Sequence, residues 1–129
     1  MLQFEHDRPR IVPPEPSLAD LTRAALGRLA HDPDGFVLVV EGGRIDHAHH
    51  FGNAHRALTD TIALSDAVRV ALQQVDLDDT LVVVTADHSH VLTFAGYAVR
   101  GNPILGLVRD VSGEDAPAGP YAVDSLGLP

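Results

Sequence analysis

Cysteine is absent from the 129-residue chain, and this absence excludes three kinds of chemistry. Without thiols there is no disulfide framework, no thiolate nucleophile and no zinc site of the cysteine type. Basic residues are also scarce, since nine Lys and Arg stand against 18 Asp and Glu and give a formal net charge of -9. Such an acidic chain repels nucleic-acid phosphates and anionic lipids, so neither is expected as a partner, whereas cations are attracted.

Long apolar runs are missing as well. No stretch approaches the ~20 consecutive apolar residues of a membrane-spanning helix, and residues 1–7 lack the basic and then apolar pattern of an export signal. We therefore expect neither a membrane segment nor a visible leader. Hydrophobic residues make up 45% and charged residues 21% of the chain, which is typical of one globular domain with one core.

Two helices are predicted from capping signals and apolar spacing. Residues 1–16 are polar and contain four prolines, which indicates a surface strap before the first helix. Ser17 and Asp20 fit a capping box that opens this helix, and residues 32–35 end it. The second helix should run from about Asn53 to Gln74, with Arg56 and Asp60 paired on its solvent side. The apolar faces are expected at Leu18, Leu21, Ala25 and Leu29, and at Ala54, Ala57, Leu58, Ile62, Val68 and Leu72.

Two unbroken apolar runs, residues 36–40 and 80–85, predict strands that are buried on both faces. Strand, helix and strand in this order form a right-handed βαβ unit, so the strands should be parallel and end at the same edge of a sheet. The fold class is therefore expected to be α/β. Beyond residue 101 the chain becomes rich in loops, with short strands expected at 104–108 and 121–123 and a loop-rich tail at 110–129.

Chemistry-bearing side chains follow both predicted strands, in residues 41–50 and 86–90. Ligands bind at the carboxyl edge of open α/β sheets, so the two segments should converge on one site. Histidine nitrogen and carboxylate oxygen suit Zn²⁺, and a carboxylate among waters suits Mg²⁺. Asp46 and His50 are one helical turn apart and can reach one ion together. Either segment alone fits a solvated loop as well as it fits a metal site. Two such segments at the same edge of a sheet favour the metal site.

Three neighbouring features favour simpler interpretations. Arg44 could pair with a substrate anion, but the acidic residues around it favour a structural ion pair. Gly42 and Gly43 lack the lysine of a phosphate-binding loop, which favours a sharp turn. Ser125 lies in a polar tail with no base beside it, which argues against a nucleophile.

Residues 40–50 and 84–91, followed by residues 94–97 and 100–102, resemble an alkaline phosphatase. Residues 15–18 and 79–81 also resemble family segments in register, and the resemblance extends over about residues 1–109. It implies a phosphate monoesterase on an α/β sandwich with a parallel-rich central sheet and flanking helices, of which residues 1–129 form a partial domain. It also implies two zinc ions, one magnesium ion, a serine nucleophile, and a periplasmic, secreted or membrane-anchored location.

The resemblance also implies roles for individual residues. His90 would lie behind the ligands of the first zinc, His47 would lie near bound phosphate, and His49 and His55 match no ligand. The implied metal ligands are Glu41 for magnesium, Asp46 and His50 for the first zinc, and Asp87 and His88 for the second.

Other parts of the family site have no match in this chain. In the family, the nucleophilic serine, an aspartate bridging two metals, a substrate-binding arginine and a hydroxyl ligand of magnesium precede the matched segments, and one zinc histidine follows them. The chain is therefore expected to be a fragment, a truncated gene product or a decayed copy that is inactive alone, with a homodimer or a complementing chain as its expected assembly. A noncatalytic metal-binding module is the alternative. A related phosphodiesterase or sulfatase is less favoured because Asp87, His88 and His90 match the monoesterase motif.

Overall fold

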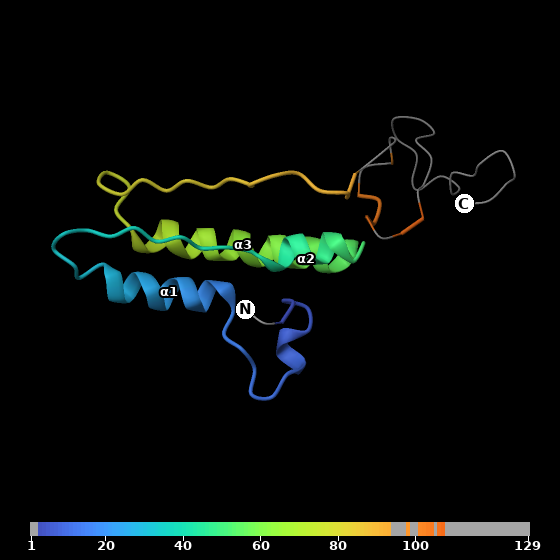
Figure 1. Cartoon of the computed structure of the whole chain (residues 1–129), viewed down its shortest axis with the longest axis horizontal. Helices are drawn as coiled ribbons and strands as arrows, with labels where there is room; N and C mark the ends of the chain where they lie inside the picture. The colour runs from blue at the N-terminus through green and yellow to red at the C-terminus, as the bar shows by residue number, and fades with distance from the viewer. Residues whose placement is uncertain (1–2, 94–97, 99–100, 105, 108–129) are drawn as a thin grey trace, which may run out of the picture. The chain divides into compact units, whose positions relative to one another are not determined.

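The computed structural model describes residues 3–93, 98, 101–104 and 106–107. The chain divides into two compact units, Met1–Leu92 and Thr93–Pro129, and all helices of the described residues lie in the first. They are the 3₁₀ helix η1 (Arg8–Arg10) and the α-helices α1 (Leu18–Leu29), α2 (Arg44–His50) and α3 (Ala54–Gln74) (Figure 1). The tail at 110–129 and the strand at 121–123 lie outside the described residues. So does part of the strand at 104–108, and its described residues 104, 106 and 107 form no strand.

Helix α1 begins where the capping signal predicts. The Ser17 side chain accepts a hydrogen bond from the Asp20 amide at 3.1 Å, and the Asp20 carboxylate accepts one from the Ser17 amide at 3.2 Å. The expected apolar face is partly wrong, however, because Leu21 is exposed and the buried positions are Leu18, Thr22 and Leu26. Thr22 can lie in the buried row because its hydroxyl donates to the Leu18 carbonyl oxygen at 2.8 Å.

Helix α3 has nearly the predicted bounds, and Asn53 caps it by accepting a hydrogen bond from the Arg56 amide at 3.0 Å. It packs against both α1 and α2 through a face of mostly small residues. The predicted face is again partly wrong, because Ile62 and Leu72 are exposed. The buried residues of α3 are Ala57, Asp60, Ala63, Ala67 and Val70.

The predicted pairing of Arg56 with Asp60 on the solvent side is also wrong. Asp60 is only 4% exposed and accepts a hydrogen bond from the Glu5 amide at 3.2 Å. Arg56 pairs instead with Asp7 of the strap, with Nη2 2.8 Å from the carboxylate oxygen. Both partners lie some fifty residues away in sequence, so the periodicity of the helix alone could not reveal them.

The N-terminal strap contributes one residue to the core, and residues 9–14 of the strap are exposed as expected. Phe4 is buried and forms a cluster with Ala48 of α2 and Ala57 of α3. The guanidinium groups of Arg44 and Arg56 lie 5.1 and 4.6 Å from the centre of its ring, within the range of cation–π attraction. One aromatic side chain therefore joins the strap to both helices.

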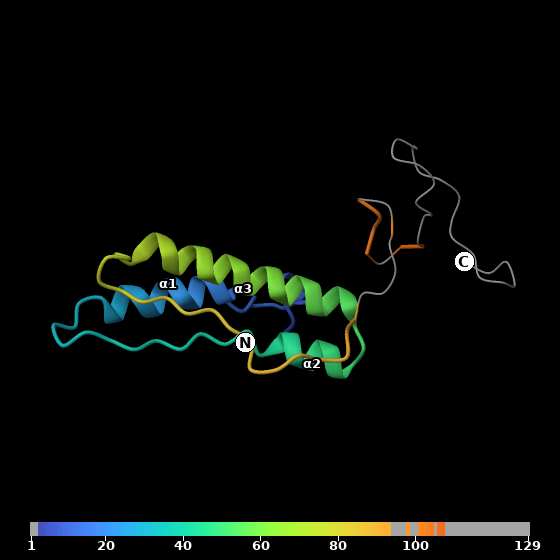
Figure 2. The ribbon, with the colours of Figure 1, turned by 90° about the horizontal axis from the view of Figure 1, so that it is seen from above.

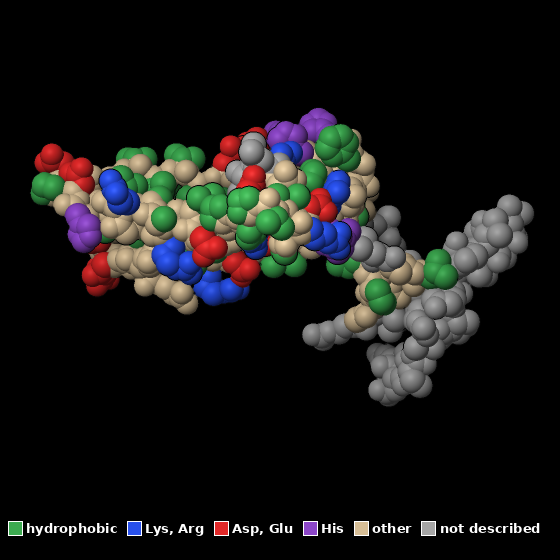
Figure 3. Space-filling view, turned by 90° about the horizontal axis from the view of Figure 1, so that it is seen from below, with side chains coloured by type: hydrophobic (Ala, Val, Ile, Leu, Met, Phe, Trp, Pro, Cys, Tyr) green, Lys and Arg blue, Asp and Glu red, His purple; other side chains and the backbone are tan. Residues whose placement is uncertain are grey.

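The two predicted strands are present as long traces without strand pairing. Residues 36–40 and 80–85 run roughly along the direction of α3, and no backbone hydrogen bond joins these two described segments (Figures 1 and 2). Alternate apolar side chains are open to solvent: Val37 is 90% exposed, Val39 84%, Leu81 87% and Val83 71%. The side chains between them, at positions 36, 38, 40 and 82, are half-buried. The face drawn in Figure 3, seen from below the view of Figure 1, also has apolar side chains at its surface among charged ones. The α/β sandwich stays a prediction, which requires partner strands from elsewhere.

We expect the chain on its own to associate through these apolar segments, because unpaired β-branched segments recruit one another. Replacing Val39 and Val83 by lysine should shift the population towards monomer in sizing chromatography with light scattering. The control pair, Ala24→Lys with Ser65→Lys, adds the same charge at exposed helix positions. A monomeric parent chain, or equal dissociation of both double variants, would contradict this account.

Candidate metal centre

Helix α2 presents two ligand side chains on one face. Asp46 and His50 are one turn apart, and the Asp46 Oδ2 lies 3.4 Å from the His50 Nε2. The Nε2 of His90, more than forty positions later in the chain, lies 3.5 Å from the other Asp46 oxygen. Ligand atoms of these three residues all lie within 4.8 Å of one another. Atoms that share a tetrahedral zinc lie about 3.4 Å apart, so a small adjustment would bring all three onto one ion.

The second predicted ligand pair reaches the same carboxylate. His88 Nε2 lies 3.9 Å from the Asp46 Oδ1 and 3.4 Å from the Asp87 Oδ2. Asp87 itself is 88% exposed in its side chain, which leaves its carboxylate open to a further ligand. The segments at 41–50 and 86–90 therefore meet, as the topology predicts, with Asp46 between them.

His90 lies against Asp46 and beside two histidine rings of α2, and its outer position behind the ligands of the first zinc stays a prediction. Its ring stacks on that of His49, with centroids 5.0 Å apart, and meets the ring of His50 edge-on at 4.7 Å. Burial, followed by repulsion from His50, lowers the pKa of His90 and favours the neutral ring that binds metals. His49, for which the sequence indicates no role, thus supports a ligand candidate by ring stacking.

His88 titrates in the opposite direction. Its Nδ1 lies 2.8 Å from the Ser89 carbonyl oxygen and donates to it, and this hydrogen bond, followed by the charge of Asp87, raises the pKa of His88. The hydrogen bond also leaves Nε2 as the ligand atom that faces Asp46 and Asp87 when the ring is neutral. A metal ion would therefore compete with a proton at His88 more than at His90.

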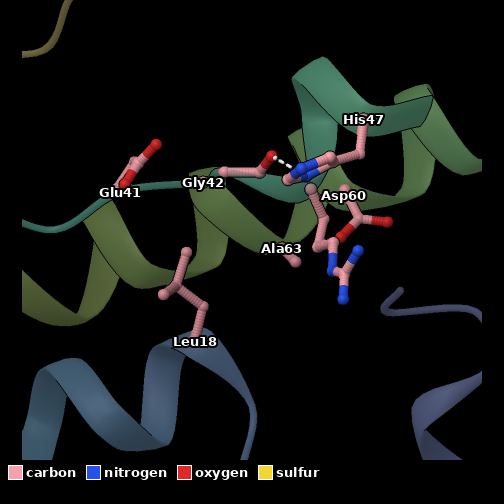
Figure 4. Close-up of a pocket in the computed structure, with 8 residues that line it drawn as sticks. Leu18, Glu41, Gly42, His47, Asp60 and Ala63 are labelled. Atoms are coloured by element: carbon pink, nitrogen blue, oxygen red, sulfur yellow. Dashed lines mark hydrogen bonds between the residues drawn. The ribbon is translucent and has the colours of Figure 1, made fainter. Parts of the chain in front are cut away.

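Glu41 and His47 lie apart from this group, beside a cavity of about 360 Å³ whose lining comes from α1, α2, α3 and the segment before α2 (Figure 4). The Nδ1 of His47 lies 2.9 Å from the Gly43 carbonyl oxygen, which only accepts, so Nδ1 carries a proton and donates. Figure 4 shows His47 and Asp60 on one side of the cavity and Glu41 on the other. The cavity is lined by Leu18, Glu41, Gly42, Gly43, Arg44, His47, Asp60 and Ala63.

Sequence reasoning missed Asp60 as a buried member of this cavity. Burial raises the pKa of Asp60, against the opposing effect of the hydrogen bond from the Glu5 amide. The available signal was its register, because Asp60 lies three positions after Ala57 and three before Ala63 and therefore on the small-residue face of α3. A charged residue on the apolar face of α3 looks like an interruption of that face unless its hydrogen-bond partner in the strap is known.

Comparisons with known proteins agree with the motifs at this centre. The sequence profile described as alkaline phosphatase matches residues 1–122. The chain belongs to the alkaline phosphatase family. It is 52% identical over 103 residues to the membrane-bound alkaline phosphatase of Bombyx mori, covering 80% of this chain and 19% of that protein. The tissue-nonspecific alkaline phosphatase of Rattus norvegicus is 47% identical over 114 residues, covering 88% of this chain and 21% of that protein.

The chain thus spans about a fifth of the length of the alkaline phosphatases that it matches. The tissue-nonspecific isozyme of Gallus gallus gives the same proportion, with 54% identity over 93 residues, 72% of this chain and 18% of that protein. Among the described residues, no helix has both the length and the apolar character needed to cross a membrane.

Removal of Asp46 should weaken zinc binding at this centre, since its carboxylate faces three of the histidines. We expect Asp46→Ala to weaken zinc binding, followed by calorimetric titration, by more than the roughly tenfold that loss of a ligand's outer partner costs. His50→Ala and His90→Ala should have smaller effects in the same direction. His31→Ala removes an exposed histidine far from the group in sequence and is the control. Equal affinities for the Asp46 and His31 variants would remove the proposed centre.

Asp60 should make the stability of the chain fall as pH rises. Its pKa is raised above the ordinary 3.8, so the folded state binds the proton more tightly and loses that advantage as pH increases through the raised pKa. Asp60→Asn keeps a hydrogen-bond acceptor but does not titrate, so it should be more stable than the parent at neutral pH and lose this difference near pH ~4. Urea unfolding between these pH values measures the change, with exposed Asp34→Asn as control. Parallel pH profiles would refute the assignment.

Proposed function

We propose that this chain supplies part of the metal site of an alkaline phosphatase that hydrolyses phosphate monoesters with zinc and magnesium. The convergence of Asp46, His50 and His90 in a chain of this family carries the proposal. Histidine nitrogen and carboxylate oxygen are donors that zinc accepts. Asp46 and His50 would hold the first zinc, Asp87 and His88 the second, and Glu41 the magnesium. The bound ions would supply charge stabilisation for the phosphoryl group and an activated oxygen nucleophile.

In this proposal, the side chains of this chain would mainly hold the metal ions in position and neutralise their positive charge. Asp46 faces His50 with one oxygen and His88 and His90 with the other, so it orients all three rings around one carboxylate. The stacked ring of His49 restricts the rotation of His90. Such restraint keeps ligand atoms in place before the ion arrives, which lowers the entropy lost on binding.

His47 is proposed to handle a proton near the phosphate. Because Nδ1 donates to the Gly43 carbonyl oxygen, the neutral ring presents its Nε2 lone pair as an acceptor. Nε2 can therefore accept a hydrogen bond from a phosphate hydroxyl or from a water molecule. The expected effect is on phosphate affinity and pH dependence, without a contribution to zinc ligation.

The serine nucleophile is proposed to come from polypeptide outside residues 1–129. Ser89 is exposed between His88 and His90, where its carbonyl oxygen holds the His88 ring, and its hydroxyl matches no nucleophile of the family. The covalent route requires an activated hydroxyl held in line with phosphorus. We therefore propose that catalysis needs the remaining segments of the family fold and that any location typical of the family is a property of the whole protein.

A chimera tests this proposal. This chain should replace the matched region of the Bombyx mori enzyme, and we expect zinc-dependent hydrolysis of p-nitrophenyl phosphate by the chimera and none by the chain alone. Asp46→Asn in the chimera should lower kcat/KM by at least about a hundredfold, since Asp46 is a proposed zinc ligand and also faces the other ligand side chains. His31→Ala should leave turnover unchanged.

Two outcomes would contradict the proposal. A folded chimera that binds zinc but shows no turnover would favour the noncatalytic metal-binding module. Turnover by the isolated chain that is lost in Ser89→Ala would place the nucleophile within this chain.

A further inference from the structure

A second pair of histidines lies outside the metal centre. His6 of the strap and His55 at the start of α3 place Nδ1 and Nε2 3.1 Å apart, with the rings edge to face and their centroids separated by 4.6 Å. Neither residue belongs to the group of Asp46, His50 and His90. The pair joins segments almost fifty positions apart in sequence.

Neighbouring contacts hold the two segments together independently of the histidines. On one side of His6, the Glu5 amide donates to the buried Asp60; on the other side, Asp7 pairs with Arg56 at 2.8 Å. His55 directly precedes Arg56 in the first turn of α3. The backbone beside both histidines is therefore held, which keeps the two imidazole rings within reach of each other.

The separation of the two nitrogens matches that of neighbouring ligands on one metal ion. With a zinc–nitrogen bond of about 2.0–2.1 Å, two ligands lie about 3.4 Å apart at the tetrahedral angle and about 2.9 Å apart at a right angle. The observed 3.1 Å lies between these values. His55 is exposed and His6 half-exposed, so water can complete the coordination shell. The opposite charges of Asp7 and Arg56 pair with each other and leave no net repulsion of a cation.

We propose that His6 and His55 bind a late first-row divalent metal ion and so clamp the strap onto α3. Imidazole suits zinc, copper and nickel, and two such ligands on separate segments bind better in the folded chain than in the unfolded one. The bound ion would replace the single N–H···N hydrogen bond that two neutral rings can form. The site is independent of the proposed phosphatase chemistry, because it uses none of the residues of the metal centre.

Zinc titration of the full chain in an Asp46→Ala, His88→Ala background tests the proposal, because these two changes weaken both zinc sites proposed for the metal centre. Calorimetry should show one remaining zinc equivalent, and His6→Ala or His55→Ala should each weaken its binding by about tenfold or more, with the double variant no worse than either. His31→Ala is the matched control. Zinc should also shift the imidazole resonances of His6 and His55 in NMR spectra before those of His31.

A structural readout separates a clamp from unspecific binding. Zinc should slow tryptic cleavage after exposed Arg10 in the strap, relative to cleavage after Arg28 in α1, and this protection should vanish in His55→Gln. Circular dichroism must show that the glutamine variant keeps its helices, so that loss of protection reports the metal and not unfolding. Unchanged zinc stoichiometry in the single variants, with no protection at Arg10, would show that the pair forms a hydrogen bond only.

Discussion

Close packing along the small-residue face of α3 is the constraint on which the rest of the structure depends. Ala57, Ala63 and Ala67 carry so little bulk that α1 and α2 both approach the backbone of α3 closely. The same face receives Phe4 of the strap at Ala57 and the Glu5 amide at Asp60. Because α2 is placed by this packing, the position of Asp46 and His50 follows from residues that carry no chemistry themselves.

Sequence reasoning correctly predicted the features that depend on local rules, such as helix caps and the spacing of residues along a helix. Ser17 and Asp20 determine the start of α1, Asn53 caps α3, and the spacing of Asp46 and His50 puts both on one face of a helix. These features depend on residues within one or two turns of each other, so no knowledge of the tertiary fold was needed. The meeting of residues 41–50 with residues 86–90 was also predicted, from the order of apolar runs.

The contacts that sequence reasoning missed join residues far apart in the chain. The rotation of the buried face of α1 towards Thr22, the burial of Asp60 and the pairing of Arg56 with Asp7 all depend on what packs opposite. A helical pattern gives the spacing of a face but not the direction in which a mixed face points. The pair of His6 and His55 could not be predicted from the sequence for the same reason, since each residue alone looks like an ordinary polar position.

The geometry of the metal centre is tied to the unpaired segments that precede it. The ligand-bearing residues 41–50 and 86–90 directly follow the long traces at 36–40 and 80–85, in which alternate valine and leucine side chains are open to solvent. Hydrogen bonds to partner strands would fix the position along the sheet at which each segment ends. They would therefore also fix the distance between Asp46 and His90. The present spread of up to 4.8 Å among the ligand atoms is wider than one zinc ion requires. Pairing of the sheet and closure of the metal centre are therefore expected to be coupled, so that metal affinity reports on completion of the fold.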